Sequence, residues 1–228
     1  MKALIYKELK LAMHPICYIF IIFFPLMILI PSYPVAVGFI YVLSCYPILF
    51  LGANKGQQSN DLLYSVLLPI RKKDIVLARI ITVALMQLVF IIIMSCLCPL
   101  AIYLQSQIEL GEGESISTGL GLNGFVSILG IAIVGFAIAD LIYFSIYYKK
   151  GKSIVMSTLL TILGFVVYLS IFTVAIPYIP GCEGYVTFLC DSGLGYQFIV
   201  LGIGLIIYVL AHFLTYKVAS KELEKVDF

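Results

Sequence analysis

The sequence contains one carboxylate, Asp140, deep within a long apolar stretch. An ionisable side chain in a bilayer core is costly, and it is a candidate functional residue by default. No Lys or Arg of the predicted membrane spans can pair with it, so three environments stay open: a protonated acid, hydrogen bonds to hydroxyls such as Tyr143 or Ser145, or a wet cavity. Intramembrane aspartyl proteolysis needs two carboxylates that share a site, and the second one is missing. We interpret Asp140 either as a structural hydrogen-bonding residue or as a residue of transport or gating.

The tripeptide Gly151-Lys152-Ser153 matches the end of a phosphate-binding loop. The full motif requires a glycine five residues before Gly151, in a loop that follows a strand. That position is Ile146, and it lies in an apolar stretch with no strand pattern before it. We therefore predict an ordinary basic loop here and no nucleotide or other cofactor bound by this chain.

Neither the histidines nor the cysteines have a spacing typical of a metal site, so none is predicted. His14 and His212 fall near the ends of predicted helices, and without an HExxH pattern we expect them to take part in interfacial packing. Cys182 and Cys190 share one predicted outer loop, where an oxidising compartment favours a disulfide over a functional thiol. The other four cysteines lie in predicted spans and are expected to act as small apolar side chains: Cys17, Cys45, Cys96 and Cys98.

The elements that position these residues are predicted to be membrane helices. Of the 228 residues, 62% are hydrophobic and 11% are charged, whereas a soluble domain has about 25% charged residues. About 20 apolar residues cross a bilayer core. We predict an all-α integral membrane protein with a single domain over residues 1–228, an amphipathic interfacial helix over 1–14, and six spans at about 15–30, 35–51, 75–103, 122–147, 153–176 and 196–216.

The distribution of basic residues predicts the orientation of these spans. All 14 Lys and Arg residues fall on one side of the six-span arrangement, and cytoplasmic loops are the ones enriched in these residues. Both termini are therefore expected in the cytoplasm. The basic residues are Lys2, Lys7, Lys10, Lys55, Arg71, Lys72, Lys73, Arg79, Lys149, Lys150, Lys152, Lys217, Lys221 and Lys225.

Glycine, alanine and proline have particular positions within the spans. Pro25, Pro47 and Pro99 lie inside the first three spans, where each removes a backbone hydrogen bond and is expected to kink its helix. The fourth span is rich in small residues, which permit close helix approach in lipid, either within the chain or in a dimer. These are Gly124, Ser127, Gly130, Ala132, Gly135, Ala137 and Ala139.

The inner loop between the second and third spans predicts a short amphipathic helix. Ser59 or Asn60 is a suitable N-cap, and Pro69 ends the helix. Apolar side chains recur along it at Leu62, Leu63, Val66 and Leu67. This helix is too short to cross a membrane, so we expect it either to lie on the membrane or to dock into a groove of a partner protein.

Two segments resemble ABC-2-type transporter permeases. The loop NDLLYSVLLPIRKKDIVLARII resembles the stretch in which a short helix, a Leu-Pro pair and a basic turn lead into the third span of those permeases. The opening MKALIYKELKLAMHP is similar to their N-terminal interfacial helix. The expected topology agrees over the whole chain, and the size is similar to that of bacterial permeases that export antimicrobial or amphipathic peptides.

The resemblance implies a division of labour between subunits. A separate ABC ATPase subunit would bind ATP and Mg, and two permease copies, identical or related, would form the pathway in a bacterial cell membrane. The chain would have no enzymatic activity of its own and no nucleic-acid partner, with membrane lipid around it. A coupling helix would contact the ATPase through Asp61, Leu62, Leu63, Tyr64, Val66, Leu67, Leu68, Pro69 and Arg71. The cargo would be amphipathic peptides or hydrophobic compounds.

A second hypothesis is a membrane accessory or immunity protein that binds a peptide or partner without transport. Such a protein needs no coupling helix, so the pattern before Pro69 argues against it. A membrane-embedded enzyme would need convergent polar residues in the spans, where Asp140 is accompanied only by scattered hydroxyls and thiols.

Overall fold

The described part of the chain is helical apart from short turns, which confirms the all-α prediction for these residues. The computed structural model describes residues 2–12, 15–29, 71–107, 124–149, 154–171, 178–180 and 193–225. Its shorter elements are α1 (Lys2–Lys7), a π-helical segment (Glu8–Ala12), α2 (Pro15–Leu26) and a 3-10 turn (Met27–Leu29). Its longer helices are α5 (Lys72–Gln107), α6 (Phe125–Lys149), α7 (Ile154–Ser170) and α9 (Leu194–Glu224).

Three of these helices, α5, α6 and α9, are long and apolar enough to cross a membrane. Shorter apolar helices occur at Tyr18–Leu29 and Met156–Ser170, within the first and fifth predicted spans. The predicted span 35–51, the short helix before Pro69 and the cysteines Cys182 and Cys190 lie outside the described residues. The count of six spans therefore stays a prediction.

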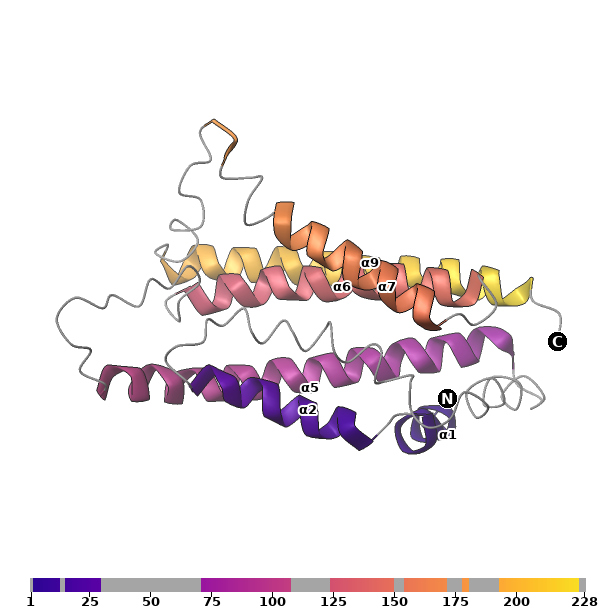
Figure 1. The fold of residues 1–228 in the computed structure, drawn as a ribbon, viewed down its shortest axis with the longest axis horizontal. Coiled ribbons are helices and arrows are strands. Elements are labelled where there is room, and N and C mark those ends of the chain that lie inside the picture. Colours follow the sequence, from indigo (N-terminus) through magenta and orange to yellow (C-terminus); the bar gives the residue numbers. More distant parts are fainter. Residues whose placement is uncertain are drawn as a thin grey trace.

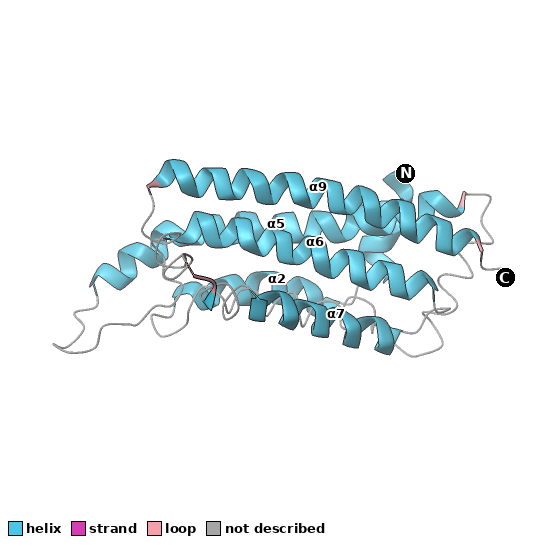
Figure 2. Cartoon of the chain, turned by 90° about the horizontal axis from the view of Figure 1, so that it is seen from above, coloured by secondary structure: helices cyan, strands magenta, loops and turns pink. Residues whose placement is uncertain are grey.

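The helices lie lengthwise beside one another in two layers (Figure 1). One layer contains α5 and α2, and the other contains α6, α7 and α9; the view from above shows the same lengthwise alignment (Figure 2). α1 lies at the end of the bundle where α5 and α7 begin and where α6 and α9 end, and α2 runs from this end toward the opposite one (Figure 1). An ion pair of 3.2 Å between Lys73 Nζ and Glu224 Oε1 joins the start of α5 to the end of α9.

The end of the bundle that contains α1 gathers basic residues from several elements, and we call it the basic end. This clustering agrees with the predicted one-sided distribution of Lys and Arg. The basic end is defined by Lys2, Lys7, Lys10, Arg71, Lys72, Lys73, Lys149, Lys217, Lys221 and Lys225.

Small residues allow α6 to lie at the centre of its layer. In the most apolar 18-residue stretch of α6, 61% of the residues are buried, against 11% in the corresponding stretch of α9. A Cβ added to Gly130 would lie 2.9 Å from the Cα of Leu201, and a Cβ on Gly204 would lie 2.5 Å from the carbonyl oxygen of Gly130. A Cβ on Gly135 would lie 2.8 Å from the ring of Phe165 in α7. The predicted close approach at these residues is therefore confirmed, and its partners are helices of the same chain.

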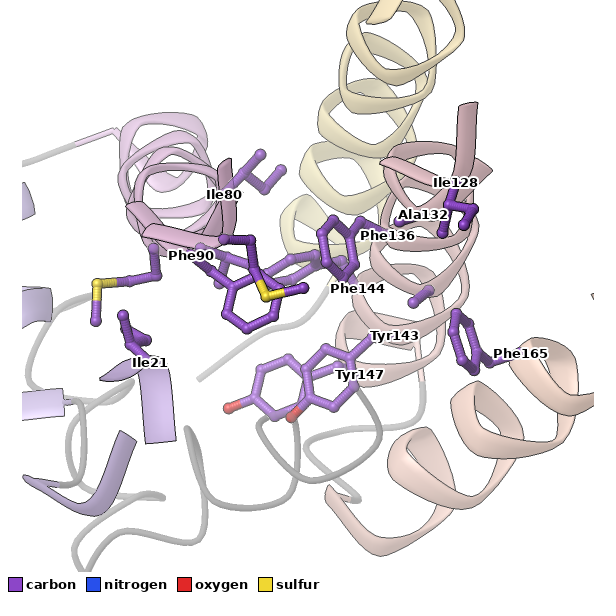
Figure 3. Close-up of a cluster of buried hydrophobic side chains, with 14 of the residues drawn as sticks. Ile21, Ile80, Phe90, Ile128, Ala132, Phe136, Tyr143, Phe144, Tyr147 and Phe165 are labelled. Carbon is purple, nitrogen blue, oxygen red and sulfur yellow. The ribbon is translucent and has the colours of Figure 1, made fainter. Parts of the chain in front are cut away.

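Aromatic side chains fill much of the buried core (Figure 3). Phe90 of α5 and Phe136 of α6 meet edge to face with their ring centroids 6.2 Å apart, an arrangement that aromatic pairs favour. Tyr168 of α7 donates a hydrogen bond of 2.9 Å to the carbonyl oxygen of Ile131 in α6. Contacts of this kind hold α5 and α7 against the central helix.

Several helix boundaries differ from the sequence prediction. The third span was expected to begin at 75, whereas α5 begins at Lys72. The sixth was expected to end at 216 and to be followed by a charged tail, whereas α9 continues to Glu224. Hydropathy marks where the apolar part ends, but a polar helix can continue beyond it. Here the last turn is supported by an ion pair of 2.7 Å between Lys225 and Glu222.

Two of the three intrahelical prolines lie in the described residues. Pro25 is next to the last residue of α2, and the chain then tightens into the 3-10 turn Met27–Leu29. α5 instead continues through Pro99 to Gln107. Proline removes the amide donor of one helical hydrogen bond, so it ends one helix and interrupts the hydrogen-bond ladder of the other. Pro47 lies outside the described residues.

Candidate functional site

Asp140 lies in a buried polar cluster between three long helices. Its side chain is 0% exposed. Gln87 of α5 donates a hydrogen bond of 3.0 Å from Nε2 to Asp140 Oδ2. His212 of α9 places Nε2 3.1 Å from the same oxygen. We call Gln87, Asp140, Tyr208 and His212 the membrane polar cluster, because α5, α6 and α9 are the three helices that can cross a membrane.

The imidazole of His212 lies between two oxygen acceptors. Its Nδ1 is 2.9 Å from the backbone carbonyl oxygen of Tyr208, one helical turn earlier, so Nδ1 carries a proton. Its Nε2 faces the Asp140 carboxylate at ion-pair distance, although the N–H direction is not aligned for a hydrogen bond. One further proton on either Nε2 or the carboxyl group makes the pair electrically neutral. A neutral pair is what a low-dielectric environment favours.

Tyr208 extends the cluster to the amide of Gln87. Its hydroxyl donates a hydrogen bond of 2.7 Å to Gln87 Oε1. The amide of Gln87 therefore accepts from α9 and donates to α6 at the same time. The ring of Tyr208 also lies 4.0 Å from the imidazole of His212, centroid to centroid.

The structure corrects the partners that the sequence suggested for Asp140. Tyr143 and Ser145 were named as hydroxyl partners, but Gln87 and His212 from neighbouring helices contact the carboxylate. The ring of Tyr143 stacks on Tyr147, with centroids 5.8 Å apart. The basic side chain that faces Asp140 is a histidine and not a Lys or Arg. The available signal was a histidine within the sixth apolar stretch.

The structure gives His212 a contact with Asp140 that the sequence did not predict. Its side chain is 14% exposed and lies against Asp140 in the bundle. His212 is twelve residues before Glu224, about 18 Å along the helix at 1.5 Å per residue. The helix continues past the end of the apolar stretch at about residue 216, so the expected role of His212 in interfacial packing stays a prediction.

A second buried cluster lies near the basic end. Arg79 of α5 donates from Nε to Glu8 Oε2 at 3.0 Å and from Nη2 to Glu8 Oε1 at 3.4 Å. Its Nη1 donates to the hydroxyl of Tyr147 in α6 at 3.5 Å. The exposed fractions are 5% for the side chain of Arg79 and 3% for that of Glu8. We call Glu8, Arg79 and Tyr147 the Arg79 cluster.

The Arg79 cluster shows two buried charges that hydropathy does not reveal. Arg79 lies two turns inside α5 and is buried. Glu8 faces inward and holds its segment against α5 through Arg79, which in turn bonds to α6. The forked geometry suits an arginine, since its guanidinium matches a carboxylate through two parallel hydrogen bonds.

The predicted coupling helix, Asp61 to Pro69, lies outside the described residues, as do Cys182 and Cys190. Arg71 is exposed directly before α5, where its carbonyl oxygen accepts a hydrogen bond of 2.9 Å from the backbone N–H of Asp74. Among the described residues no three metal-ligating side chains come together.

Comparison with known proteins gives the family. Residues 3–220 match a protein family described as "ABC-2 family transporter protein". Neither a curated protein nor a solved structure matches the chain. The match covers nearly the whole chain, including α5, α6, α9 as far as Ser220, and both polar clusters. The chain therefore belongs to the ABC-2 family of transporter proteins.

Proposed function

We propose that this chain is the permease subunit of an ATP-driven exporter and that a separate ABC ATPase subunit hydrolyses the nucleotide. The observation that carries the proposal is the family match over residues 3–220. It is supported by long apolar helices that are tied together inside the bundle by hydrogen-bonded polar residues. Buried polar groups of this kind mark pathways and moving parts in membrane proteins.

The orientation that we propose places the basic end in the cytoplasm of a bacterial cell. Positively charged residues favour the cytoplasmic side. Both α1 and the C-terminal end of α9 lie at the basic end (Figure 1). Both termini would then be cytoplasmic. α2 leads away from the basic end and α5 starts at it, so a return crossing between them, at the apolar residues 35–51, gives the six spans.

The proposed coupling helix, Asp61 to Pro69, precedes the start of α5 directly in the chain. Its apolar residues Leu62, Leu63, Val66 and Leu67 would seat in a groove of the ATPase, with Arg71 at the edge. Closure of the ATPase would then displace α5. α5 supplies Arg79 to one polar cluster and Gln87 to the other, so a displacement of this helix acts on both.

Two copies of the chain, or this chain and a related one, would enclose the pathway. The cargo that we propose is an amphipathic peptide or a hydrophobic compound that enters from the bilayer, since the spans are apolar. Asp140 would act in gating, as the carboxylate that joins α6 to α5 and α9.

The test is co-purification of the chain with its ATPase after the double substitution Leu62→Asp and Leu67→Asp. Two carboxylates on the apolar face of the coupling helix should abolish the complex and leave membrane insertion intact. The matched control is Leu194→Asp, an exposed position at the start of α9, opposite the basic end. Complex formation that survives the double substitution would remove the coupling-helix assignment, and a chain that transports without any ATPase would remove the proposed function.

A further inference from the structure

α5 is held to the rest of the bundle unevenly. It packs against α9 and α2 and only slightly against α6. α6 and α9, in contrast, have the most extensive helix–helix contact in the described structure, with Gly130 and Gly204 at backbone distance. We call these two helices the α6–α9 pair, and α5 lies beside the pair as a separate helix.

Gln87 is the α5 side chain that is bonded to both members of the pair. Its Nε2 donates to Asp140 of α6 at 3.0 Å, and its Oε1 accepts from Tyr208 of α9 at 2.7 Å. A primary amide offers both a donor end and an acceptor end. Gln87 is 4% exposed, so these bonds form in an interior where lost partners are not replaced by water.

The two hydrogen bonds of Gln87, to Asp140 and to Tyr208, form a polar bridge that lies well inside α5. Gln87 lies 15 residues after Lys72, the first residue of α5, and this is about 22 Å along the helix. A movement imposed at the basic end therefore reaches Gln87 through a continuous helix. From there the two side-chain hydrogen bonds lead into the α6–α9 pair.

We infer that Gln87 is the positioning residue through which a displacement of α5 is passed to the α6–α9 pair. The inference rests on the proposed function, because the displacement is the one that the ATPase imposes on the start of α5. The polar bridge makes the three helices move together by shifts of about 1–2 Å, the scale of helix shifts in switching proteins. Without the bridge, the polar links that remain from α5 to the pair include those nearer the basic end, from Lys73 to Glu224 and from Arg79 to Tyr147, and the middle of α5 would meet the pair through apolar contacts such as Phe90 with Phe136.

The variant that tests the inference is Gln87→Met. Methionine keeps the length and approximate volume of glutamine and removes both ends of the amide. Tyr208→Phe is the second variant, since it removes only the bond to α9 and keeps the ring against His212. Leu88→Met is the matched control, because Leu88 follows Gln87 in α5 and is exposed on the lipid-facing surface.

The measurement is hydrogen–deuterium exchange of the permease–ATPase complex in nanodiscs, without nucleotide and after trapping with ATP and vanadate. In the wild type and in Leu88→Met, trapping should change exchange in peptides from α5, α6 and α9. In Gln87→Met the change in α5 should stay, the changes in α6 and α9 should be lost, and ATP hydrolysis should continue. In Tyr208→Phe, which keeps the bond from Gln87 to Asp140, the changes in α6 and α9 should be reduced together but not lost.

Two results would overturn the inference, and they are distinguishable. If α6 and α9 of Gln87→Met respond to trapping as they do in the wild type, the bridge transmits nothing, although the proposed function stands. If trapping changes nothing in α5 of the wild type, the ATPase does not act on this helix. The proposed function then fails, and the inference fails with it.

Discussion

Glu8 and Arg79 form a buried ion pair across 71 positions of the sequence, with Arg79 Nε 3.0 Å from Glu8 Oε2. The pair fixes the N-terminal helical segment to α5, and Tyr147 of α6 receives a further hydrogen bond from the same guanidinium. The segment that the sequence describes as a helix lying on the membrane surface is therefore an integral part of the basic end.

Replacing Glu8 by Gln should destabilise the protein. The substitution leaves the guanidinium of Arg79 buried without its counter-charge, and breaking a buried pair from one side costs about 3–5 kcal/mol. Thermal unfolding of the purified chain in detergent, followed by size-exclusion chromatography, measures the effect. The double variant Glu8→Met and Arg79→Met should be less destabilised than Glu8→Gln, because no unpaired charge is left.

The control for this prediction is Glu222→Gln, which removes the exposed pair with Lys225 at the end of α9. Exposed pairs contribute little, so this variant should unfold at the wild-type temperature. Equal unfolding temperatures for Glu8→Gln and Glu222→Gln would show that the buried pair does not stabilise the fold.

Two glycines on α9 should respond to alanine in opposite directions. A Cβ on Gly204 would lie 2.5 Å from the carbonyl oxygen of Gly130, so Gly204→Ala should cost about 1–3 kcal/mol through overpacking. Gly202 has nothing within 4 Å of the added carbon, and Gly202→Ala should stabilise the helix by about 0.5–1 kcal/mol. Unfolding temperatures of the two variants give the comparison, and a shift in the same direction for both would exclude the close contact.

Removing the carboxylate of Asp140 should weaken the packing of three helices. Asp140→Leu leaves the amide of Gln87 without its acceptor and the imidazole of His212 without the carboxylate that faces it, at about 1–3 kcal/mol for an unsatisfied buried group. Asp140→Asn keeps an oxygen for Gln87 and should be affected less. The double variant Asp140→Leu and His212→Phe should lower the unfolding temperature by less than the sum of the decreases in the two single variants. Additive single effects would show that the two side chains do not interact.

Labelling of single cysteines tests the orientation of the bundle. In a cysteine-free background, a membrane-impermeant maleimide should label Leu194→Cys in intact cells, because α9 starts at the end opposite to the basic end. Lys73→Cys and Lys225→Cys should be labelled only after permeabilisation. Labelling of Lys73→Cys in intact cells would reverse the proposed topology.

Features that depend on local composition were predictable from the sequence. The long apolar helices and the clustering of Lys and Arg at one end follow from hydropathy and charge along the chain. The small residues of α6 also predicted close packing. The partner of Gly130 was not predictable, because the sequence does not define the register of α6 against the helix that contains Gly204.

The polar clusters were only partly predictable, because they depend on long-range register. Asp140 was recognised by its position, but its partners come from α5 and α9, 53 and 72 residues away along the chain. The burial of Glu8 and Arg79 could not be predicted, since each has its partner 71 residues away along the chain. A salt bridge between distant helices leaves no periodic pattern in a single sequence.

Proline at position 99 divides α5 into two mechanically different parts. The portion from Lys72 to Gln87 has no proline, so its helical hydrogen-bond ladder is uninterrupted. Further along α5, Pro99 has no amide hydrogen to donate to the carbonyl oxygen of Ser95. One helical hydrogen bond is therefore missing there, and the helix can bend at this point. A displacement imposed at Lys72 would therefore reach the middle of the bundle through an uninterrupted hydrogen-bond ladder, whereas the residues after Pro99 could change their tilt without following it.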